Sequence, residues 1–465
     1  MPAVNETVAD LRLLDALRAT THCDVYGPTD DGYDRERRTF TGLLAQSPGA
    51  IVVADTAADI QAAVRVAADF GLSVAVTSTG HGAHRPCDGG ILISTEKLQG
   101  VEINPDRQTA VVQAGTRLQV VMEAAHKHGL TAVIGTSDQV AASGYLLGGG
   151  SGLLSRLHGW AAETIVAATI VTADGELRTI DAEHEPELLW GLRGTAGNFG
   201  VVTELEMQLF PHAEIYAGAL LFPPERAREI LLAYDAWTAD LPETTCTYVA
   251  LAKVPPPLAP PPFPDGRFVG VWVVHAGPAE EGADLLAPIR ALGPIVDTVT
   301  TIPSSAIATI AGGSPGPMPL VDRSRLLDRL TPDAIDRLLA VAGPDSDSQL
   351  RVIQLRHLGG QVARATSADS PLTHPRADYL VLAFGLAFKP TEVEVITGDL
   401  DRLYAALADY DGGSPIPNGM GSGTDPETVQ GAYDPESWTR LVALKSQYDP
   451  QNIFSYNHNI APGTP

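Results

Sequence analysis

A strand–helix–strand unit that runs into a glycine-rich stretch is the feature that most constrains the fold of this chain. Within residues 50–78, AIVVA indicates a buried strand, TAADIQAAVRVAADFG an amphipathic helix and LSVAVTS a second strand. Thr56 is the expected N-cap of the helix and Gly71 its C-terminal stop. The stretch VTSTGHGAHRPCDGG, residues 76–90, follows at once. This order predicts an α/β unit that ends in a ligand-binding loop.

The pattern of the chain changes after Pro211. Before it, residues 100–115 and 165–181 have the alternation and turn residues of hairpins, and residues 117–129 form an amphipathic helix. After it, helices are expected over 223–242, 331–342 and 392–409, and strands over the segments CTYVALAKV, GRFVGVWVVHA, QLRVIQLRHL and DYLVLAFGLAF. The segment 436–462 should be a helix followed by extended chain. We therefore predict an α+β protein of two parts.

Charge and cysteine content narrow the class of protein. The chain has 31 Lys and Arg against 56 Asp and Glu, a formal charge of −25, which opposes binding to nucleic acid or to anionic membranes. Its 3 cysteines are too few for a disulfide framework, and no segment has the pattern of a secretory signal or a membrane span. We expect a soluble cytoplasmic protein, and the sequence predicts no particular oligomeric state.

His81 lies between two glycines and admits two interpretations. With His84 and Cys87 it forms an H-x2-H-x2-C spacing that suits zinc, but no further Cys/His pair lies nearby to complete the site. Glycine-rich loops instead present backbone N–H groups to phosphates, and a second cluster stands at residues 148–152. The chain has neither a Rossmann GxGxxG turn nor a P-loop. Two glycine clusters favour a dinucleotide held in an extended pose, and no metal.

Five separated motifs carry a resemblance to a known family. They are STGHG (78–82), GTSDQVAASGYLLGGGSGLLSRLHGWAAETI (135–165), ADGELRTI (173–180), LLWGLRGTAGNFGVVTELE (188–206) and YDPQNIFSYNHNI (448–460). In this order they resemble the berberine bridge enzyme-like branch of the FAD-linked oxidases, whose flavin domain is shared with vanillyl-alcohol oxidase and p-cresol methylhydroxylase.

The resemblance implies a division of the chain. It predicts a two-part PCMH-type FAD-binding domain, formed by the N-terminal region and the C-terminal tail, with a substrate domain of antiparallel sheet and helices. The expected boundaries are an N-terminal helical segment at 1–44, the FAD-binding domain at 45–213, the substrate domain at 214–420 and a C-terminal segment at 421–465 that returns to the FAD domain.

The resemblance also implies how FAD is bound. His81 matches the histidine that carries the 8α-methyl of FAD, and Ser137 stands where many relatives have a second, cysteinyl anchor, so we expect one covalent bond. Val140 matches the position beside flavin C4a that admits oxygen. The expected cofactor-binding residues are Ser78, Thr79, Gly80, His81, Gly82, Thr136, Ser137, Val140, Gly144, Gly148, Gly149, Gly152, Val202, Asn457 and Asn459.

The chain departs from the family where the catalytic base usually stands. Relatives often place an aromatic residue directly after the glycine triplet and a tyrosine in a late Y-x-N motif, whereas this chain has Ser151 and Ile416. Only the asparagine of that motif, Asn418, is kept. The replacement candidates are Tyr145, just before the triplet, and His357, with Arg356 beside it to stabilise an anion. The structural alternatives are packing beneath the flavin for Tyr145 and a structural histidine on a strand of the substrate domain for His357.

The expected reaction is an oxidation. The resemblance implies hydride transfer from a C–OH or C–H carbon of a secondary-metabolite-type small molecule to flavin N5, with O2 as acceptor and H2O2 as product. The alternatives are a dehydrogenase with another acceptor, an oxygenating or cyclising flavoenzyme of natural-product biosynthesis, a zinc enzyme built on His81, His84 and Cys87, and an FAD-binding protein without catalysis.

Overall fold

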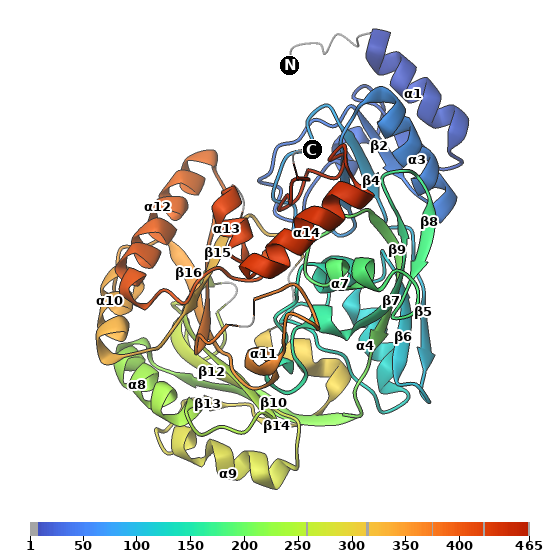
Figure 1. Cartoon of the computed structure of the whole chain (residues 1–465). Coiled ribbons are helices and arrows are strands. Elements are labelled where there is room, and N and C mark those ends of the chain that lie inside the picture. The colour runs from blue at the N-terminus through green and yellow to red at the C-terminus, as the bar shows by residue number, and fades with distance from the viewer. Residues whose placement is uncertain (1–7, 257–258, 313–315, 374, 422–423, 464–465) are drawn as a thin grey trace.

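The computed structural model describes residues 8–256, 259–312, 316–373, 375–421 and 424–463. Three sheets organise these residues, and helices cover them from outside (Figure 1). The antiparallel second and third sheets and the mixed helices confirm the predicted α+β class. Among the described residues, no helix combines the length and the apolar composition that crossing a bilayer requires.

The first sheet contains the predicted strand–helix–strand unit. Its strand order is β1-β2-β4-β3, in which β4 pairs in parallel with both β2 and β3. Thr56 caps α3 in a reciprocal capping box with Asp59, and Gly71 ends the helix in the left-handed conformation, as predicted. The elements of this region are α1 Val8–Thr20, β1 Asp24–Tyr26, α2 Tyr33–Glu36, β2 Ala50–Val53, α3 Ala57–Phe70, β3 Val74–Thr77 and β4 Ile91–Ser94.

The second sheet is antiparallel, with the order β5-β6-β9-β7-β8. Both predicted hairpins are present, as β5–β6 and β7–β8. The strand β9 joins them at the centre, because it follows the glycine-rich turn near residue 197 and returns between them. The elements are β5 Val101–Asn104, β6 Thr109–Gln113, α4 Leu118–His126, α5 Ala142–Leu147, α6 Ser155–His158, η1 Ala161–Thr164, β7 Ile165–Val171, β8 Leu177–Ile180, α7 Pro186–Leu192 and β9 Val201–Gln208.

The third sheet has eight antiparallel strands in the order β13-β10-β12-β11-β16-β17-β15, with β14 paired beside β10. Its strands are β10 Glu214–Phe222, β11 Thr245–Lys253, β12 Arg267–His275, β13 Val296–Asp297, β14 Thr300–Pro303, β15 Leu320–Leu327, β16 Leu350–His357 and β17 Tyr379–Leu386. Its helices are η2 Pro224–Arg226, α8 Ala227–Thr238, α9 Ala279–Arg290, η4 Ser304–Ala311, α10 Pro332–Ala342, α11 Gln361–Arg364, α12 Pro390–Ala406 and η5 Ala408–Tyr410.

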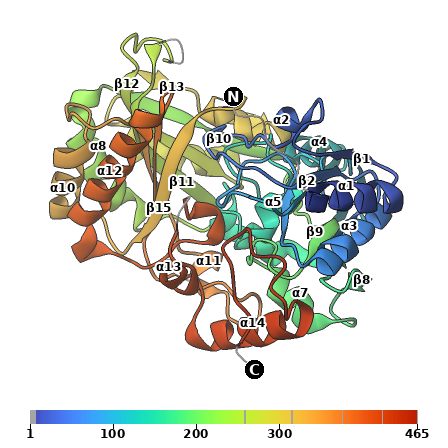
Figure 2. The same cartoon turned by 90° about the horizontal axis from the view of Figure 1, so that it is seen from above.

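The two faces of the third sheet have different neighbours. Helices α8, α9, α10 and α12 form the outer rim of the molecule, and their apolar residues make one core with the strand residues on that face (Figures 1 and 2). On the opposite face, side chains such as Tyr248, Ala250 and Leu380 join the core that continues into the second sheet. Because side chains alternate along a strand, each strand contributes to both sides. The inner face is therefore available to build a site.

The C-terminal segment returns to the first two sheets. It contains η6 Pro417–Gly419, α13 Pro426–Gln430 and α14 Pro435–Tyr448, and then extended chain. The Val74 N–H donates to the Ile453 carbonyl at 2.7 Å, which attaches the tail to the end of β3. The buried ammonium of Lys445 donates to the Asn198 and Phe454 carbonyls and to Asp449. These bonds hold the tail beside the glycine-rich loops of the N-terminal region.

Candidate active site

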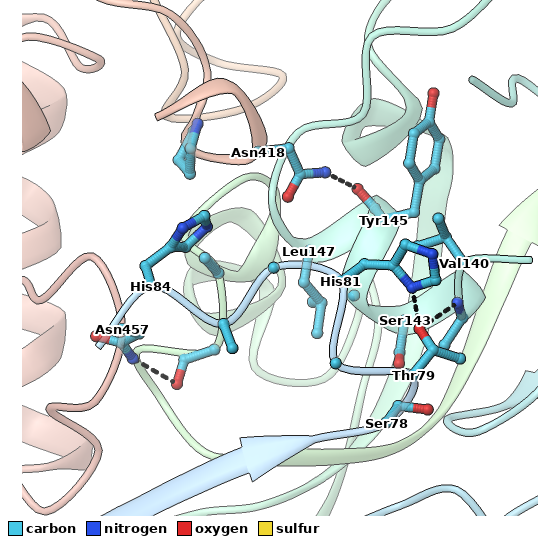
Figure 3. A pocket seen from close by; sticks show the side chains of 18 of the residues that line it. Ser78, Thr79, His81, His84, Val140, Ser143, Tyr145, Leu147, Asn418 and Asn457 are labelled. Carbon is cyan, nitrogen blue, oxygen red and sulfur yellow. Dashed lines mark hydrogen bonds between the residues drawn. The ribbon is translucent and has the colours of Figure 1, made fainter. Parts of the chain in front are cut away.

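A cavity of about 410 Å³ lies where the first sheet, the second sheet and the inner face of the third sheet meet. Its lining comes mainly from parts of the chain that are distant in sequence: residues 75–85, residues 135–151, residues 196–202, strands β15 to β17, and the segments 416–419 and 456–458. Figure 3 shows side chains from several of these segments around the cavity, among them Ser78, His81, Tyr145, Asn418 and Asn457. The cavity is the meeting point of the regions that the sequence analysis singled out.

His81 is held by its neighbours in the glycine loop. Gly80 adopts φ +70°, a conformation that a Cβ would strain, and its carbonyl accepts a hydrogen bond from the Phe40 N–H. The imidazole of His81 stacks on Phe40 with ring centroids 3.7 Å apart, and the Thr79 hydroxyl lies 2.9 Å from Nδ1 (Figure 3). The other ring nitrogen, Nε2, is buried and has no hydrogen-bond partner.

The His81 ring is neutral at physiological pH. Burial, helped by the positive charge of Arg117, lowers its pKa to about 4. A neutral imidazole keeps a lone pair on one ring nitrogen, and Nε2 is the nitrogen without a partner. The loop therefore presents a neutral imidazole in the cavity, with a lone pair on one of its two ring nitrogens.

Other buried polar atoms at the cavity also lack partners. They are the hydroxyl oxygens of Ser78, Ser137 and Tyr145 and the amide oxygen of Asn457. Leaving such an atom buried and unpaired costs about 1–3 kcal/mol each, so several together indicate a polar ligand that completes them. This set fits FAD, whose pyrophosphate, ribityl chain and ring edge offer both donors and acceptors.

The predicted cofactor-binding residues separate into two groups. Those that line the cavity are Ser78, Thr79, Gly80, His81, Gly82, Thr136, Ser137, Val140, Gly144, Val202 and Asn457. Those outside the described lining are Gly148, Gly149, Gly152 and Asn459.

The glycine triplet packs against protein. A Cβ on Gly148 would lie 1.7 Å from the Asn418 amide oxygen, and one on Gly149 would lie 2.9 Å from Ile416. Asn418 also donates from its backbone N–H to the Gly148 carbonyl and from its side chain to the Tyr145 carbonyl, at 2.9 and 2.7 Å. The triplet thus lets the segment 416–418 approach α5 closely and form one wall of the cavity.

Arg356 projects from β16 into the cavity beside Tyr145. Its guanidinium donates to the Ser151 carbonyl and to the Gln354 side chain, and it lies over the ring of Tyr248. No carboxylate pairs with it among the described residues. Burial lowers the pKa of Arg356 but leaves the group cationic, and burial raises the pKa of Tyr145 well above its usual value. The cavity wall therefore carries a positive charge next to a neutral phenol.

His357 lies on the other face of β16. It does not line the cavity, and its ring is 5.9 Å from that of Tyr379, a residue of the core beneath the outer helices. Alternation along the strand explains the placement, because neighbouring residues point to opposite sides. Of the four candidate catalytic residues, the structure brings Tyr145, Arg356 and Asn418 together and separates His357 from them.

Two histidines at the cavity were not selected in the sequence analysis as cofactor-binding residues. His84 and His458 both line it, with ring centroids 4.3 Å apart. Burial lowers the pKa of His84 to about 4 and that of His458 to about 3, so both rings are neutral. Cys87 is buried in a separate apolar cluster, away from this pair. Only the contact between loop and tail reveals the pair, since 374 residues of sequence separate the two rings.

Comparison with known protein families agrees with this site. Residues 48–181 match the family described as FAD binding domain, and residues 423–461 match the family described as Berberine and berberine like. The first match contains the His81 loop and the second contains the tail that closes the cavity.

Individual relatives cover nearly the whole chain. An (R)-6-hydroxynicotine oxidase of Paenarthrobacter nicotinovorans is 27% identical, over 94% of this chain and 96% of its own length. An FAD-linked oxidoreductase of Dictyostelium discoideum is 25% identical, over 90% of each chain.

Solved structures agree in fold. The crystal structure of 6-hydroxy-D-nicotine oxidase from Arthrobacter nicotinovorans superposes with a TM-score of 0.82 at 26% identity, covering 95% of this chain and 98% of that one. Xylooligosaccharide oxidase from Myceliophthora thermophila gives 0.84 at 22% identity, over 97% and 100%, which is a likeness of fold. The chain thus combines a region that matches the FAD binding domain with a C-terminal region that matches the berberine-like family, and it is similar over nearly its whole length to FAD-linked oxidoreductases.

Proposed function

We propose that this oxidoreductase is an oxidase. It would transfer a hydride from a C–OH or C–H carbon of a small, secondary-metabolite-type substrate to N5 of FAD and use O2 as the acceptor, giving H2O2. The observation that carries the proposal is the shared cavity, which is lined both by the His81 loop and by Tyr145, Arg356 and Asn418. A cofactor and a substrate can therefore meet in one enclosed space.

The attachment of FAD is proposed at His81 alone. The neutral ring and its unpartnered Nε2 provide the nucleophile that a bond to the flavin methyl group needs. Ser137 lines the cavity, and none of its described lining residues is a cysteine. A second bond to the flavin, a thioether, therefore cannot form from these residues, because none of them supplies a sulfur.

The side chains on the substrate wall have separate roles in the proposed reaction. Bound FAD supplies the hydride acceptor and the route for electrons to O2. The neutral hydroxyl of Tyr145 would hold the oxygen or nitrogen of the substrate by a hydrogen bond. The Arg356 guanidinium would stabilise the negative charge that develops on that atom as its proton passes to solvent. Asn418 keeps the backbone of Tyr145 in place through its 2.7 Å bond.

Val140 supports O2 as the acceptor. It lines the cavity, and its small side chain leaves more room than leucine or isoleucine would. Stopped-flow mixing of the reduced enzyme with O2-saturated buffer tests this directly. Rapid reoxidation is expected, and reoxidation that is slow with O2 but fast with a quinone would make the enzyme a dehydrogenase.

The first experiment is an intact-mass measurement on the denatured protein together with in-gel flavin fluorescence. We expect a mass increase of one FAD and a flavinylated peptide that contains His81. The His81→Ala variant should lose the covalent flavin, whereas the Ser137→Ala control should retain it. Covalent flavin in His81→Ala would refute the attachment, and a wild-type preparation without any flavin would refute the function.

A further inference from the structure

Asp322 is a carboxylate on the substrate wall of the cavity. It lies on β15 and lines the cavity with Ser324, its neighbour two residues along the strand, as alternation requires. It is also the sole Asp or Glu among the described residues of that lining. Asp322 could not be recognised as a site residue from the sequence, because its strand LVDRSRLL also contains two arginines.

The Asp322 side chain has no partner on another residue. No hydrogen bond or ion pair joins it to any described residue, and its polar contact is with its own backbone N–H. The adjacent Arg323 points to the opposite face, where it pairs with Asp401 at 2.5 Å. Burial raises the pKa of Asp322, which reflects the cost of keeping a charge in this wall without a counter-charge.

On the sheet that carries Asp322, the cation of the cavity lining is Arg356, while Arg85 lines the cavity from the glycine loop. Leu380 and Leu382 of β17 line the cavity between Asp322 and Arg356. In the register of the sheet, Asp322 lies opposite Phe384 and Arg356 lies opposite Leu380. These two positions are four residues apart along β17, roughly 13 Å at the rise of a strand. The wall thus has a negative end at Asp322 and a positive end at Arg356.

We propose that Asp322 binds a basic nitrogen of the substrate, one that is protonated at neutral pH. This inference names the substrate class of the proposed oxidase site and rests on that proposed function. A cation beside the carboxylate offsets the cost of its burial, and a charge-assisted hydrogen bond is about twice as strong as one to a neutral hydroxyl. The opposed charges also orient the substrate, with its basic nitrogen at β15 and its electron-rich oxygen at Arg356.

Matched amine and alcohol probes test the proposal by binding alone. Isothermal titration calorimetry with the full-length holoenzyme would compare tryptamine with tryptophol, tyramine with tyrosol, and 2-phenylethylamine with 2-phenylethanol. Each pair differs only in the cationic group. We expect at least one amine to bind about tenfold or more tightly than its alcohol, and Asp322→Asn to abolish this preference.

The control is Asp401→Asn, which removes the α12 carboxylate that pairs with Arg323 on the opposite face of β15 and should keep the preference. Asp322→Glu retains the negative charge and should keep part of the preference for the amine. The proposal is overturned if no amine binds more tightly than its alcohol in the wild type, or if Asp322→Asn keeps the preference. Calorimetry needs no turnover, so a missing flavin in the mass spectrum would refute the proposed function separately.

Discussion

Arg356 brings a positive charge to the lining of the cavity, next to the Tyr145 hydroxyl. It is a half-buried cation whose described partners are a carbonyl, an amide and an aromatic ring, all uncharged. A protein tolerates such an arrangement when the charge serves a ligand, since uncompensated burial is costly. Tyr145 next to it remains a phenol because burial raises its pKa, even though the guanidinium acts in the opposite direction.

We therefore predict that Arg356→Met lowers kcat/KM by about 10²- to 10³-fold, the effect of removing one preorganised donor from a developing anion. The amount of covalently bound flavin should not change, because Arg356 lies on β16 and the proposed attachment is at His81. Steady-state O2 consumption and intact mass check the two halves of this prediction. Arg351→Met on the same strand is the matched control, since Arg351 is outside the cavity lining. Equal activity of Arg356→Met and wild type would remove Arg356 from the mechanism.

At the scale of elements, the glycine triplet controls how closely the segment 416–418 approaches α5. The Cβ of an alanine at Gly148 would overlap the Asn418 side chain, which must then move and release its bond to the Tyr145 carbonyl. We predict that Gly148→Ala lowers the free energy of unfolding by about 1–3 kcal/mol, the range for overpacking, and lowers kcat because the cavity wall shifts.

Gly398→Ala is the control for that measurement. Gly398 lies inside α12, and a Cβ there meets nothing within 4 Å. This change should raise the free energy of unfolding by about 0.5–1 kcal/mol, because alanine is the better helix former. Urea denaturation of both variants measures these changes in the free energy of unfolding. A Gly148→Ala protein as stable and as active as the wild type would show that the triplet has no packing role.

Local signals in the sequence predicted most elements correctly. The Thr56 cap, the Gly71 stop and the two hairpins depend on residues next to each other in the chain, so their patterns can be recognised without the fold. The His81 loop lines the cavity, as its flanking glycines indicated for a ligand-binding loop, and its role as the flavin anchor, which the resemblance implies, stays a prediction.

The residues that the sequence could not assign are those whose role depends on strand register and on distant contacts. His357 and Arg356 are neighbours, and only the pairing of β16 shows which of them faces the cavity. Asp322 becomes notable only when β15 is placed at the edge beside β17, and His84 only when the tail brings His458 to it. The glycine triplet looked like a phosphate loop because close backbone approach has the same signature for a ligand and for protein.

At the scale of the whole molecule, the cavity exists only when distant regions fold together. Four histidines with lowered pKa values lie far apart in the sequence: His84 in the glycine loop, His158 in α6, His357 in β16 and His458 in the tail. Desolvation by burial lowers the pKa of each, to about 4 for the first two and about 3 for the last two. The native state therefore holds them neutral wherever they occur, and its stability depends on all of them at once.

This coupling predicts a loss of stability on the acid side. Because the folded pKa values lie below the unfolded value of about 6.5, the unfolded chain takes up protons first as the pH falls. The stabilisation is complete above pH 6.5 and decreases as the pH falls towards 4 and 3. Each histidine contributes a slope of up to about 1.4 kcal/mol per pH unit.

Urea denaturation between pH 7 and 5 measures this dependence of the free energy of unfolding on pH. His357→Gln should reduce the slope by up to one proton, because its ring is exchanged for a group that does not titrate. An unchanged slope in that variant would mean that His357 is protonated equally in the folded and unfolded states.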